Sequence, residues 1–249
     1  MTQADKDKFA RLCEDDLVMS QNDGDCIGTY NEKRLHRILK RYVTDDAEHY
    51  EVRVGACVAD ILENGRVTEI QTASFRPLQG KIENYLAATE YSVTVLHPLV
   101  ESKTILRADK ETGEILYTKK SPKKGRDTDI LPQMYYLKDF VANSRFEVRI
   151  LHVRADEYRF SERMRYRREG AYDNDLRPVE LLSETVFRSP MDYVCILPEE
   201  LRCGEFTSAD FSKVTKHKGR RLSLAISFLL YVGVLERRKD GKRYIYKVV

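Results

Sequence analysis

Two alternating segments joined by a hairpin turn constrain the fold of this chain more than any other feature. Residues 50–61 and 67–72 both show the period of two that is typical of β-strands. In the first segment, the residues that share one parity are Val52, Val54, Ala56 and Val58. Between the segments lies Asn64-Gly65, the dipeptide most typical of a two-residue hairpin turn. The sequence therefore predicts two neighbouring antiparallel strands.

Helices are expected on either side of this hairpin. Asn31 is placed to cap a helix before it, and Pro77 lies in the first turn of a helix after it. Their apolar residues at helical spacing are Leu35, Ile38, Leu39 and Tyr42 in the first helix and Leu78, Ile82, Tyr85 and Leu86 in the second. A buried strand at 91–96, ended by Pro98, follows. This order of elements predicts an α/β fold, a mixed β-sheet flanked by helices.

The other elements before the C-terminal region are expected to be short. Residues 9–18 predict one helix, and 104–108 with 114–118 predict a hairpin. Residues 146–153 read as a strand, and 156–188 as a connector.

Three oxygen-bearing side chains lie on the first hairpin. Glu69 and Gln71 share one side of the second strand because they are two residues apart, and Asp60 is expected at the end of the strand before it. Carboxylates are hard ligands that suit Mg²⁺ or Mn²⁺. Such a metal can polarise a phosphodiester and lower the pKa of a bound water. The pattern favours a metal site, and its alternative is two exposed acids beside a turn.

The spacing of Asp60, Glu69 and Gln71, with the order of elements around them, resembles the PD-(D/E)xK nuclease superfamily. The resemblance covers residues 31–108 and implies a restriction-endonuclease-like domain, which we assign to 29–155. It implies that Asp60 and Glu69 bind the metal and that Gln71 orients the attacking water. Gln71 stands where the family usually has lysine. Glutamine has no positive charge and cannot take a proton, although some restriction enzymes of the superfamily use it there.

Three further residues are candidates for accessory roles. Glu32 and His36 share one face of the first helix, and the resemblance implies that Glu32 is an accessory metal ligand. An ordinary surface pair is the alternative for both residues. Lys81, one turn into the second helix, could reach a phosphate and partly replace the missing lysine, or could simply be solvated.

The charge of the chain is distributed unevenly. Residues 213–249 contain eleven Lys or Arg against Glu236 and Asp240, a net charge of +9. Because the whole chain carries +3, residues 1–212 carry −6. A basic segment of this kind predicts a polyanionic partner, although charged segments are also often only solvated.

The C-terminal residues 189–249 form the last expected domain. Two helices and a basic hairpin that turns at Asp240-Gly241 resemble a winged helix-turn-helix. The resemblance implies that the second helix enters the major groove of DNA and that the hairpin contacts the backbone. The candidate DNA-binding residues are Lys218, Arg220, Arg221, Arg237, Arg238, Lys239, Lys242 and Arg243. A winged helix that serves protein contact or dimerisation is the alternative.

Two segments in the middle of the chain are basic without a defined motif. Residues 121–126, Ser-Pro-Lys-Lys-Gly-Arg, could contact phosphate or be merely exposed. Residues 154–170 mix arginines with aromatic residues, a composition that suits nucleic acid and equally a solvated helix face.

Several classes of protein are disfavoured. The five cysteines are odd in number and form no CxxC pair, which argues against a disulfide framework or a cysteine zinc site and fits a reducing compartment. No signal peptide is recognisable at the start, and the apolar run 222–235 is too short to cross a bilayer. We therefore expect a cytoplasmic protein with no membrane partner. P-loop, HExxH and GxSxG motifs do not occur.

The principal hypothesis is a Mg²⁺- or Mn²⁺-dependent DNA endonuclease, with RNA not excluded as substrate. Cleavage of both strands of a duplex needs two active sites, which a homodimer would supply. The alternative is a non-catalytic DNA-binding or regulatory protein on a nuclease-like scaffold.

Overall fold

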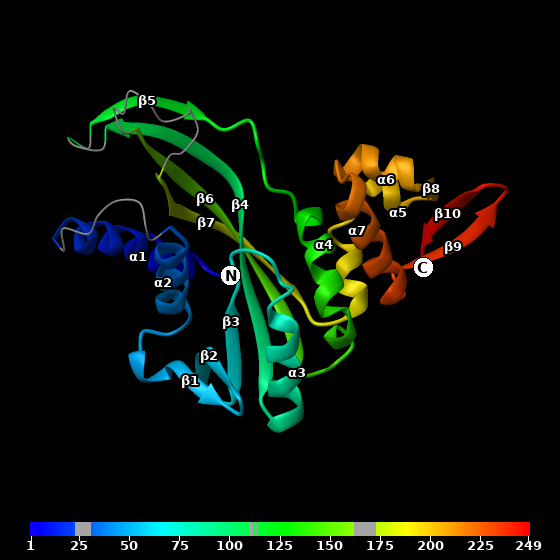
Figure 1. Cartoon of the computed structure of the whole chain (residues 1–249), viewed down its shortest axis with the longest axis horizontal. Helices are drawn as coiled ribbons and strands as arrows, with labels where there is room; N and C mark the ends of the chain where they lie inside the picture. Colours follow the sequence, from blue (N-terminus) through cyan, green and yellow to red (C-terminus); the bar gives the residue numbers. More distant parts are fainter. Residues whose placement is uncertain (23–30, 110–111, 113, 162–172) are drawn as a thin grey trace. The chain divides into compact units, whose positions relative to one another are not determined.

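The computed structural model describes residues 1–22, 31–109, 112, 114–161 and 173–249, together with side chains at 1–16, 34–109, 112, 114–159 and 176–249 (Figure 1). The fold is α/β, with a large mixed sheet flanked by helices. Along the sheet the strands follow the order β1-β2-β3-β4-β6-β7, and β5 pairs with β4. Their bounds are β1 Tyr50–Val54, β2 Cys57–Glu63, β3 Arg66–Ile70, β4 Ser92–Asp109, β5 Ile115–Lys120, β6 Phe146–Ser161 and β7 Asp173–Phe187.

The chain forms two compact units, and the long strands contribute to both. Unit 1 comprises Met1–Tyr50, His97–Gly125 and Ile150–Thr185. Unit 2 comprises Glu51–Leu96, Arg126–Arg149 and Val186–Val249. Both units are therefore assembled from segments that are distant in the sequence, and neither corresponds to a continuous domain.

The predicted turn at Asn64-Gly65 joins β2 to β3. Both residues have a positive φ, 49° and 71°, as a tight hairpin turn of this type requires. The two strands pair antiparallel, with Ile61 opposite Thr68 and Leu62 opposite Val67. The turn dipeptide thus sets the register of the hairpin.

Residues 50–61 form two strands, β1 and β2, where one strand was expected. The break lies at Gly55, whose φ is +60°, a conformation that favours glycine. A Cβ at Gly55 would also lie 2.7 Å from Oδ1 of Asn84, so the Asn84 side chain would have to shift. After the break, the prediction of which residues share the buried face is wrong. Val58 is 44% exposed, whereas Ala59 and Ile61 are buried. Asp60 therefore lies inside β2 and not at its end.

Helix α3, Leu78–Ala88, connects β3 to β4, which run parallel. Leu78, Ile82 and Tyr85 are buried at the helical spacing that the sequence predicts. A helical crossover is the usual connection between parallel strands, and it places one face of α3 against the sheet.

Pro98 does not end the strand that contains it. β4 continues to Asp109. Pro98 lies between the end of the pairing of β4 with β3, at Leu96, and the start of its pairing with β5, at Thr104. Between these pairings a missing N–H costs no hydrogen bond to either strand. The hairpin of β4 with β5 is present as predicted.

The segment expected as a connector is largely strand. β6 continues to Ser161, beyond the expected end at Val153, and β7 occupies Asp173–Phe187. β7 lies at the edge of the sheet, where the proline within it, Pro178, is tolerated. The connector prediction for 156–188 is therefore wrong for these strands.

Two helices begin unit 1. Helix α1, Gln3–Asn22, extends beyond the expected 9–18, and α2, Asn31–Val43, begins where the sequence predicts. Phe9 packs edge-to-face on Tyr42 with ring centroids 5.5 Å apart. The carboxylate of Asp16 is buried and receives hydrogen bonds from Arg34, at 2.8 Å, and Arg37.

The C-terminal part of unit 2 contains a second sheet, in the order β8-β10-β9. Its elements are α5 Glu199–Arg202, β8 Glu205–Thr207, α6 Ser208–Thr215, α7 Gly219–Tyr231, β9 Leu235–Asp240 and β10 Arg243–Val248. The expected helices and hairpin are present, and β8 was not predicted. Thr207 begins α6 with a side chain that accepts from the N–H of Asp210.

Short helical segments complete the structure. They are η1 Ala47–His49, η2 Asp127–Ile130, α4 Leu131–Met134, η3 Tyr135–Phe140 and η4 Pro190–Val194. Within the described part of the chain, no helix has an apolar stretch long enough to cross a bilayer.

Candidate functional site

Asp60 of β2 and Glu69 of β3 lie just beyond the paired part of the hairpin. The last pair of the ladder joins Ile61 to Thr68, and Asp60 and Glu69 are the next residue on each strand. The carboxylate of Asp60 accepts a hydrogen bond from the N–H of Ile70 at 2.7 Å. Glu69 is only 2% exposed, whereas Asp60 is half-buried. The two acids that the sequence singles out are thus neighbours in unit 2.

Helix α3 supplies two donors to the buried carboxylate. Lys81 Nζ lies 2.9 Å from Oε1 and 2.7 Å from Oε2 of Glu69. Tyr85 Oη donates to Oε1 at 2.8 Å. Lys81 and Tyr85 are four residues apart, so they lie on the same face of α3. The sequence predicted Tyr85 only as a core residue, although its spacing from Lys81 placed both on one face.

The surroundings of Glu69 disfavour its negative charge. Burial raises its pKa above the usual value, and the nearby charge of Asp60 adds to this effect, whereas Lys81 and Tyr85 oppose it. Burial and the hydrogen bond to Glu69 also raise the pKa of Tyr85. With both acids ionised, Asp60, Glu69 and Lys81 together carry a charge of −1. A further cation would reduce this electrostatic cost.

Gln71 lies directly after β3. Its N–H donates to the carbonyl of Leu96 at 2.9 Å, which continues the pairing of β3 with β4. Its side-chain Oε1 accepts from the N–H of Ala73 at 3.3 Å. Gln71 therefore contributes to the turn after β3, and its orientation of a water stays a prediction.

The described residues contain no group of three or more His, Cys, Asp or Glu side chains arranged to hold a metal ion. Asp60 and Glu69 provide two carboxylates. This number is compatible with Mg²⁺, which is usually bound by one or two carboxylates and keeps several waters.

Glu32 and His36 lie on α2, which belongs to unit 1, whereas Asp60 and Glu69 belong to unit 2. The side chain of Glu32 lies outside the described residues, and His36 is half-buried. Their accessory role stays a prediction.

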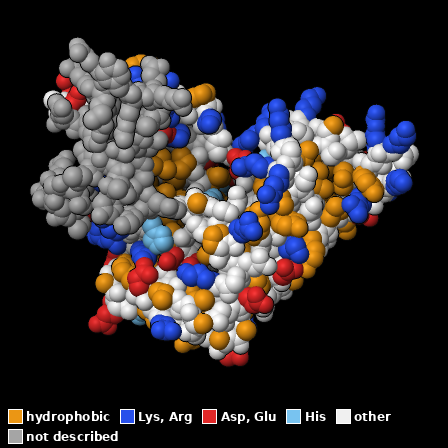
Figure 2. All heavy atoms as spheres, in the orientation of Figure 1, with side chains coloured by type: hydrophobic (Ala, Val, Ile, Leu, Met, Phe, Trp, Pro, Cys, Tyr) orange, Lys and Arg blue, Asp and Glu red, His pale blue; other side chains and the backbone are white. Residues whose placement is uncertain are grey.

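Basic side chains are exposed on the hairpin of β9 and β10, as Figure 2 shows at the right of the molecule. The exposed residues are Arg237, Arg238, Lys239, Lys242 and Arg243. Two of them have partners within unit 2. Arg238 forms a two-pronged ion pair with Glu205 at 3.1 and 2.7 Å, and the Arg237 guanidinium lies 4.8 Å from the centre of the Tyr244 ring.

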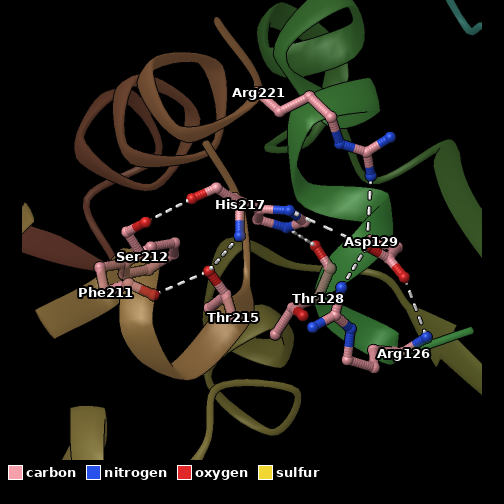
Figure 3. A network of polar contacts seen from close by, with 8 residues as sticks. All are labelled: Arg126, Thr128, Asp129, Phe211, Ser212, Thr215, His217 and Arg221. Atoms are coloured by element: carbon pink, nitrogen blue, oxygen red, sulfur yellow. Dashed lines mark hydrogen bonds and ion pairs between the residues drawn. The ribbon is translucent and has the colours of Figure 1, made fainter. Parts of the chain in front are cut away.

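The start of α7 carries the other predicted DNA-binding residues, Lys218, Arg220 and Arg221, all of them exposed. Arg221 donates to Asp129 at 3.2 Å, as Figure 3 shows. Just before the helix, the buried His217 donates from Nε2 to the carbonyl of Thr128 at 2.8 Å. These contacts connect α7 to η2 and were not predicted, because no local pattern links residues so far apart in the sequence.

Comparison with known proteins identifies the family of the chain. Residues 33–188, which include Asp60, Glu69 and Lys81, match a family described as "Domain of unknown function (DUF8091)". A relative from Treponema pallidum (strain Nichols), titled "Uncharacterized protein", is 26% identical over 167 residues. The match covers 66% of this chain and 64% of the relative, so the chain spans less than two thirds of that protein. No solved structure matches the chain. Because the family match exceeds half of its length, the chain belongs to the DUF8091 family.

Proposed function

We propose that this protein is a metal-dependent nuclease whose active site is the cluster of Asp60, Glu69 and Lys81. One observation carries the proposal. Two acids directly follow the last pair of the β2–β3 ladder, and a lysine nitrogen lies within 2.9 Å of the buried one. Acids and a lysine together suit phosphodiester chemistry, because that reaction needs both metal ligands and positive charge near the phosphate.

The order of elements supports the same proposal. α2, the strands β1 to β3, α3 and β4 follow one another as the resemblance to PD-(D/E)xK nucleases implies, with the first expected strand divided in two. Gln71 stands where the family usually has lysine. Lys81 of α3 donates a hydrogen bond to the Glu69 carboxylate instead. We infer that Lys81 supplies the positive charge that Gln71 lacks.

Asp60 and Glu69 would hold Mg²⁺ or Mn²⁺, and the charge of −1 on the cluster suits a cation. When bound, such a metal polarises the phosphodiester and lowers the pKa of a bound water. Lys81 has three N–H donors and a side chain that is 33% exposed, so it can donate to a phosphate oxygen while it stays near Glu69. The amide of Gln71 can orient a water through its donors and its acceptor.

We propose that the C-terminal elements from β8 to β10 form a winged helix that binds DNA. α6, α7 and the basic β9–β10 hairpin follow in the order that this family uses. The exposed cations of the hairpin would contact phosphates, and such contacts make binding depend on salt. Substitution of Lys239, Lys242 and Arg243 by alanine should therefore weaken DNA binding and reduce its salt slope. Unchanged binding would refute the DNA-binding role of the hairpin.

The nuclease proposal is tested by cleavage of plasmid DNA, single-stranded DNA and RNA in the presence of Mg²⁺ or Mn²⁺. We expect the wild type to cleave and Asp60→Asn to be inactive, because asparagine keeps an oxygen for the Ile70 N–H but loses the charge. Glu83→Gln is the matched control, since it removes an exposed acid of α3. Absence of metal-dependent cleavage by the wild type on every substrate would refute catalysis.

A non-catalytic DNA-binding or regulatory protein is the second candidate. One observation favours it: Lys81 and Tyr85 already satisfy the Glu69 carboxylate, as they would in a structural role. DNA binding that depends on the β9–β10 hairpin, without cleavage of any substrate, would select this candidate.

A further inference from the structure

Strand β5 presents a continuous exposed surface in unit 1. All six of its residues are exposed. Its large apolar and aromatic residues, Ile115, Leu116 and Tyr117, are 49, 55 and 53% exposed. Neighbouring exposed hydrophobic side chains of this size mark interaction surfaces more often than single ones do.

One face of the β4–β5 hairpin combines a tyrosine with cations. The register pairs Arg107 with Tyr117 and Ile105 with Lys119, so these four side chains share one face of the ladder. Lys119 Nζ lies 6.0 Å from the centre of the Tyr117 ring.

These residues line an open groove of about 520 Å³, to which Leu116 of β5 and Arg159 of β6 also contribute. Arg159 is in turn held by Glu157 at 2.8 Å. The volume falls within the roughly 300–1,000 Å³ that is typical of small-ligand clefts.

The charge around the groove indicates what kind of partner it suits. Its lining includes three cations, Arg107, Lys119 and Arg159, and no acidic residue. A second copy of this chain would bring an equal positive charge against it, so self-association through this strand is disfavoured. A polyanion is favoured, and it must also offer a flat apolar surface to the Tyr117 ring.

We propose that this groove, lined by Ile105, Arg107, Leu116, Tyr117, Lys119 and Arg159, binds single-stranded nucleic acid. A base stacks on the Tyr117 ring, and Arg107 and Lys119 neutralise the adjacent phosphates. Bases in a duplex are stacked on each other and cannot offer a free face, so the ring selects unpaired nucleotides. The inference rests on the proposed function only in taking nucleic acid as the partner, and it names the form of that partner.

The test measures binding of a labelled oligothymidylate to the full-length chain by fluorescence anisotropy, in EDTA so that no metal-dependent cleavage occurs. Tyr117→Ala should weaken binding about fivefold or more. A fivefold loss corresponds to the lower end of the range of free energies measured for one base-stacking contact. Tyr117→Phe should bind like the wild type because it keeps the ring. Thr118→Ala is the matched control, since it lies on the same strand but on the opposite face. Arg107→Ala and Lys119→Ala should each reduce the salt slope.

Three results would overturn the inference. Equal binding by Tyr117→Ala and Tyr117→Phe would remove the stacking role. The second concerns a duplex of equal length. If Tyr117→Ala lowers the affinity for the duplex as much as the affinity for the single strand, the ring does not select unpaired nucleotides. The third is displacement of the oligonucleotide by polyglutamate or by phosphatidylserine vesicles at equal charge concentration. This result would show that the groove binds any polyanion and does not recognise bases. Cleavage by the Asp60 site is measured separately with Mg²⁺, so failure of either proposal leaves the other testable.

Discussion

Lys81 donates to both carboxylate oxygens of Glu69, at 2.9 and 2.7 Å, although the two residues lie on different elements. Glu69 is buried on β3, and Lys81 reaches it from α3 with one third of its side chain exposed. The buried carboxylate therefore depends on Lys81 for two of its hydrogen bonds. The proposed nuclease activity would give the same lysine a second role.

Lys81→Met should destabilise the fold. It removes both hydrogen bonds of Lys81 to a carboxylate that is 2% exposed and leaves Oε2 without its Lys81 donor, and an unsatisfied buried acceptor costs about 1–3 kcal/mol. Urea unfolding at neutral pH measures the loss. Lys213→Met, which replaces an exposed lysine of α6, is the control and should change the unfolding free energy by less than about 0.5 kcal/mol. Equal effects of both substitutions would contradict the structural role of Lys81.

Binding of Mn²⁺ should depend on pH through Glu69. Burial and the charge of Asp60 raise the Glu69 pKa, so its folded-state pKa exceeds the unfolded value and ionisation costs stability as pH rises through that range. A metal binds the ionised carboxylate, so its affinity should rise as pH increases above the ordinary pKa of 4.5. Calorimetric titration of Mn²⁺ at several pH values measures this. In Glu69→Gln the affinity should be weak, and a pH dependence identical to the wild type would contradict the assignment.

Lys81→Ala should reduce cleavage more than Gln71→Ala. Lys81 carries the positive charge next to the carboxylates, whereas the Gln71 side chain bonds to the N–H of Ala73. Loss of one preorganised charge at a reaction centre costs about 10²–10³ in kcat, and we expect a smaller loss at Gln71. Single-turnover cleavage rates at saturating metal make the comparison. A larger loss in Gln71→Ala would assign the essential role to position 71.

Arg220→Ala should weaken DNA binding more than Arg221→Ala. Both side chains are exposed at the start of α7, but Arg221 donates to Asp129, which neutralises part of its charge (Figure 3). Loss of one phosphate contact lowers the salt slope by about 0.9. We expect this change for Arg220→Ala in duplex binding and a smaller one for Arg221→Ala. Asp129→Asn should restore the contribution of Arg221, and an unchanged affinity in that variant would contradict the neutralisation.

Stability should fall as pH decreases because of His217. Burial lowers its pKa below the usual 6.5, despite the hydrogen bond to Thr128 and the nearby Asp129. As pH falls below 6.5, the unfolded chain therefore binds a proton at His217 more readily than the folded chain does. The free energy of unfolding decreases as pH falls from 6.5 toward the folded-state pKa.

Urea unfolding at about pH 7.5 and about pH 5.5 checks the His217 prediction. His217→Gln should reduce the difference between the two values, because glutamine can donate to the Thr128 carbonyl but does not titrate. His49→Gln, which replaces a partly exposed histidine, is the control. A pH difference that persists fully in His217→Gln would contradict the prediction.

Elements with local signals were predicted well. The Asn64-Gly65 turn tolerates positive φ, and the apolar stripes of α2 and α3 follow helical spacing, so short-range chemistry identified them. β7 was missed because Pro178 and polar residues at its start weaken the strand pattern. Pairing in the sheet, which is a tertiary contact, outweighs that weak propensity.

The candidate site was predicted in part. Asp60 and Glu69 were expected on one hairpin because the Asn64-Gly65 turn joins their strands, and both lie on it. Lys81 was expected near a phosphate, but its bonds to Glu69 depend on the crossover that returns α3 over the sheet. The prediction that Asp60 ends its strand was wrong, because the chain breaks at Gly55 and β2 then continues through Asp60 to Glu63.

The sequence by itself determined the α/β class, the hairpin that carries both acids and the concentration of positive charge in the C-terminal segment. These features depend on spacing and composition, which short stretches of chain express independently. Only the tertiary structure decided that Lys81 and Tyr85 share Glu69 and that Asp129 engages Arg221. Hydrogen bonds between side chains on different elements depend on how those elements pack, and no local pattern encodes that packing.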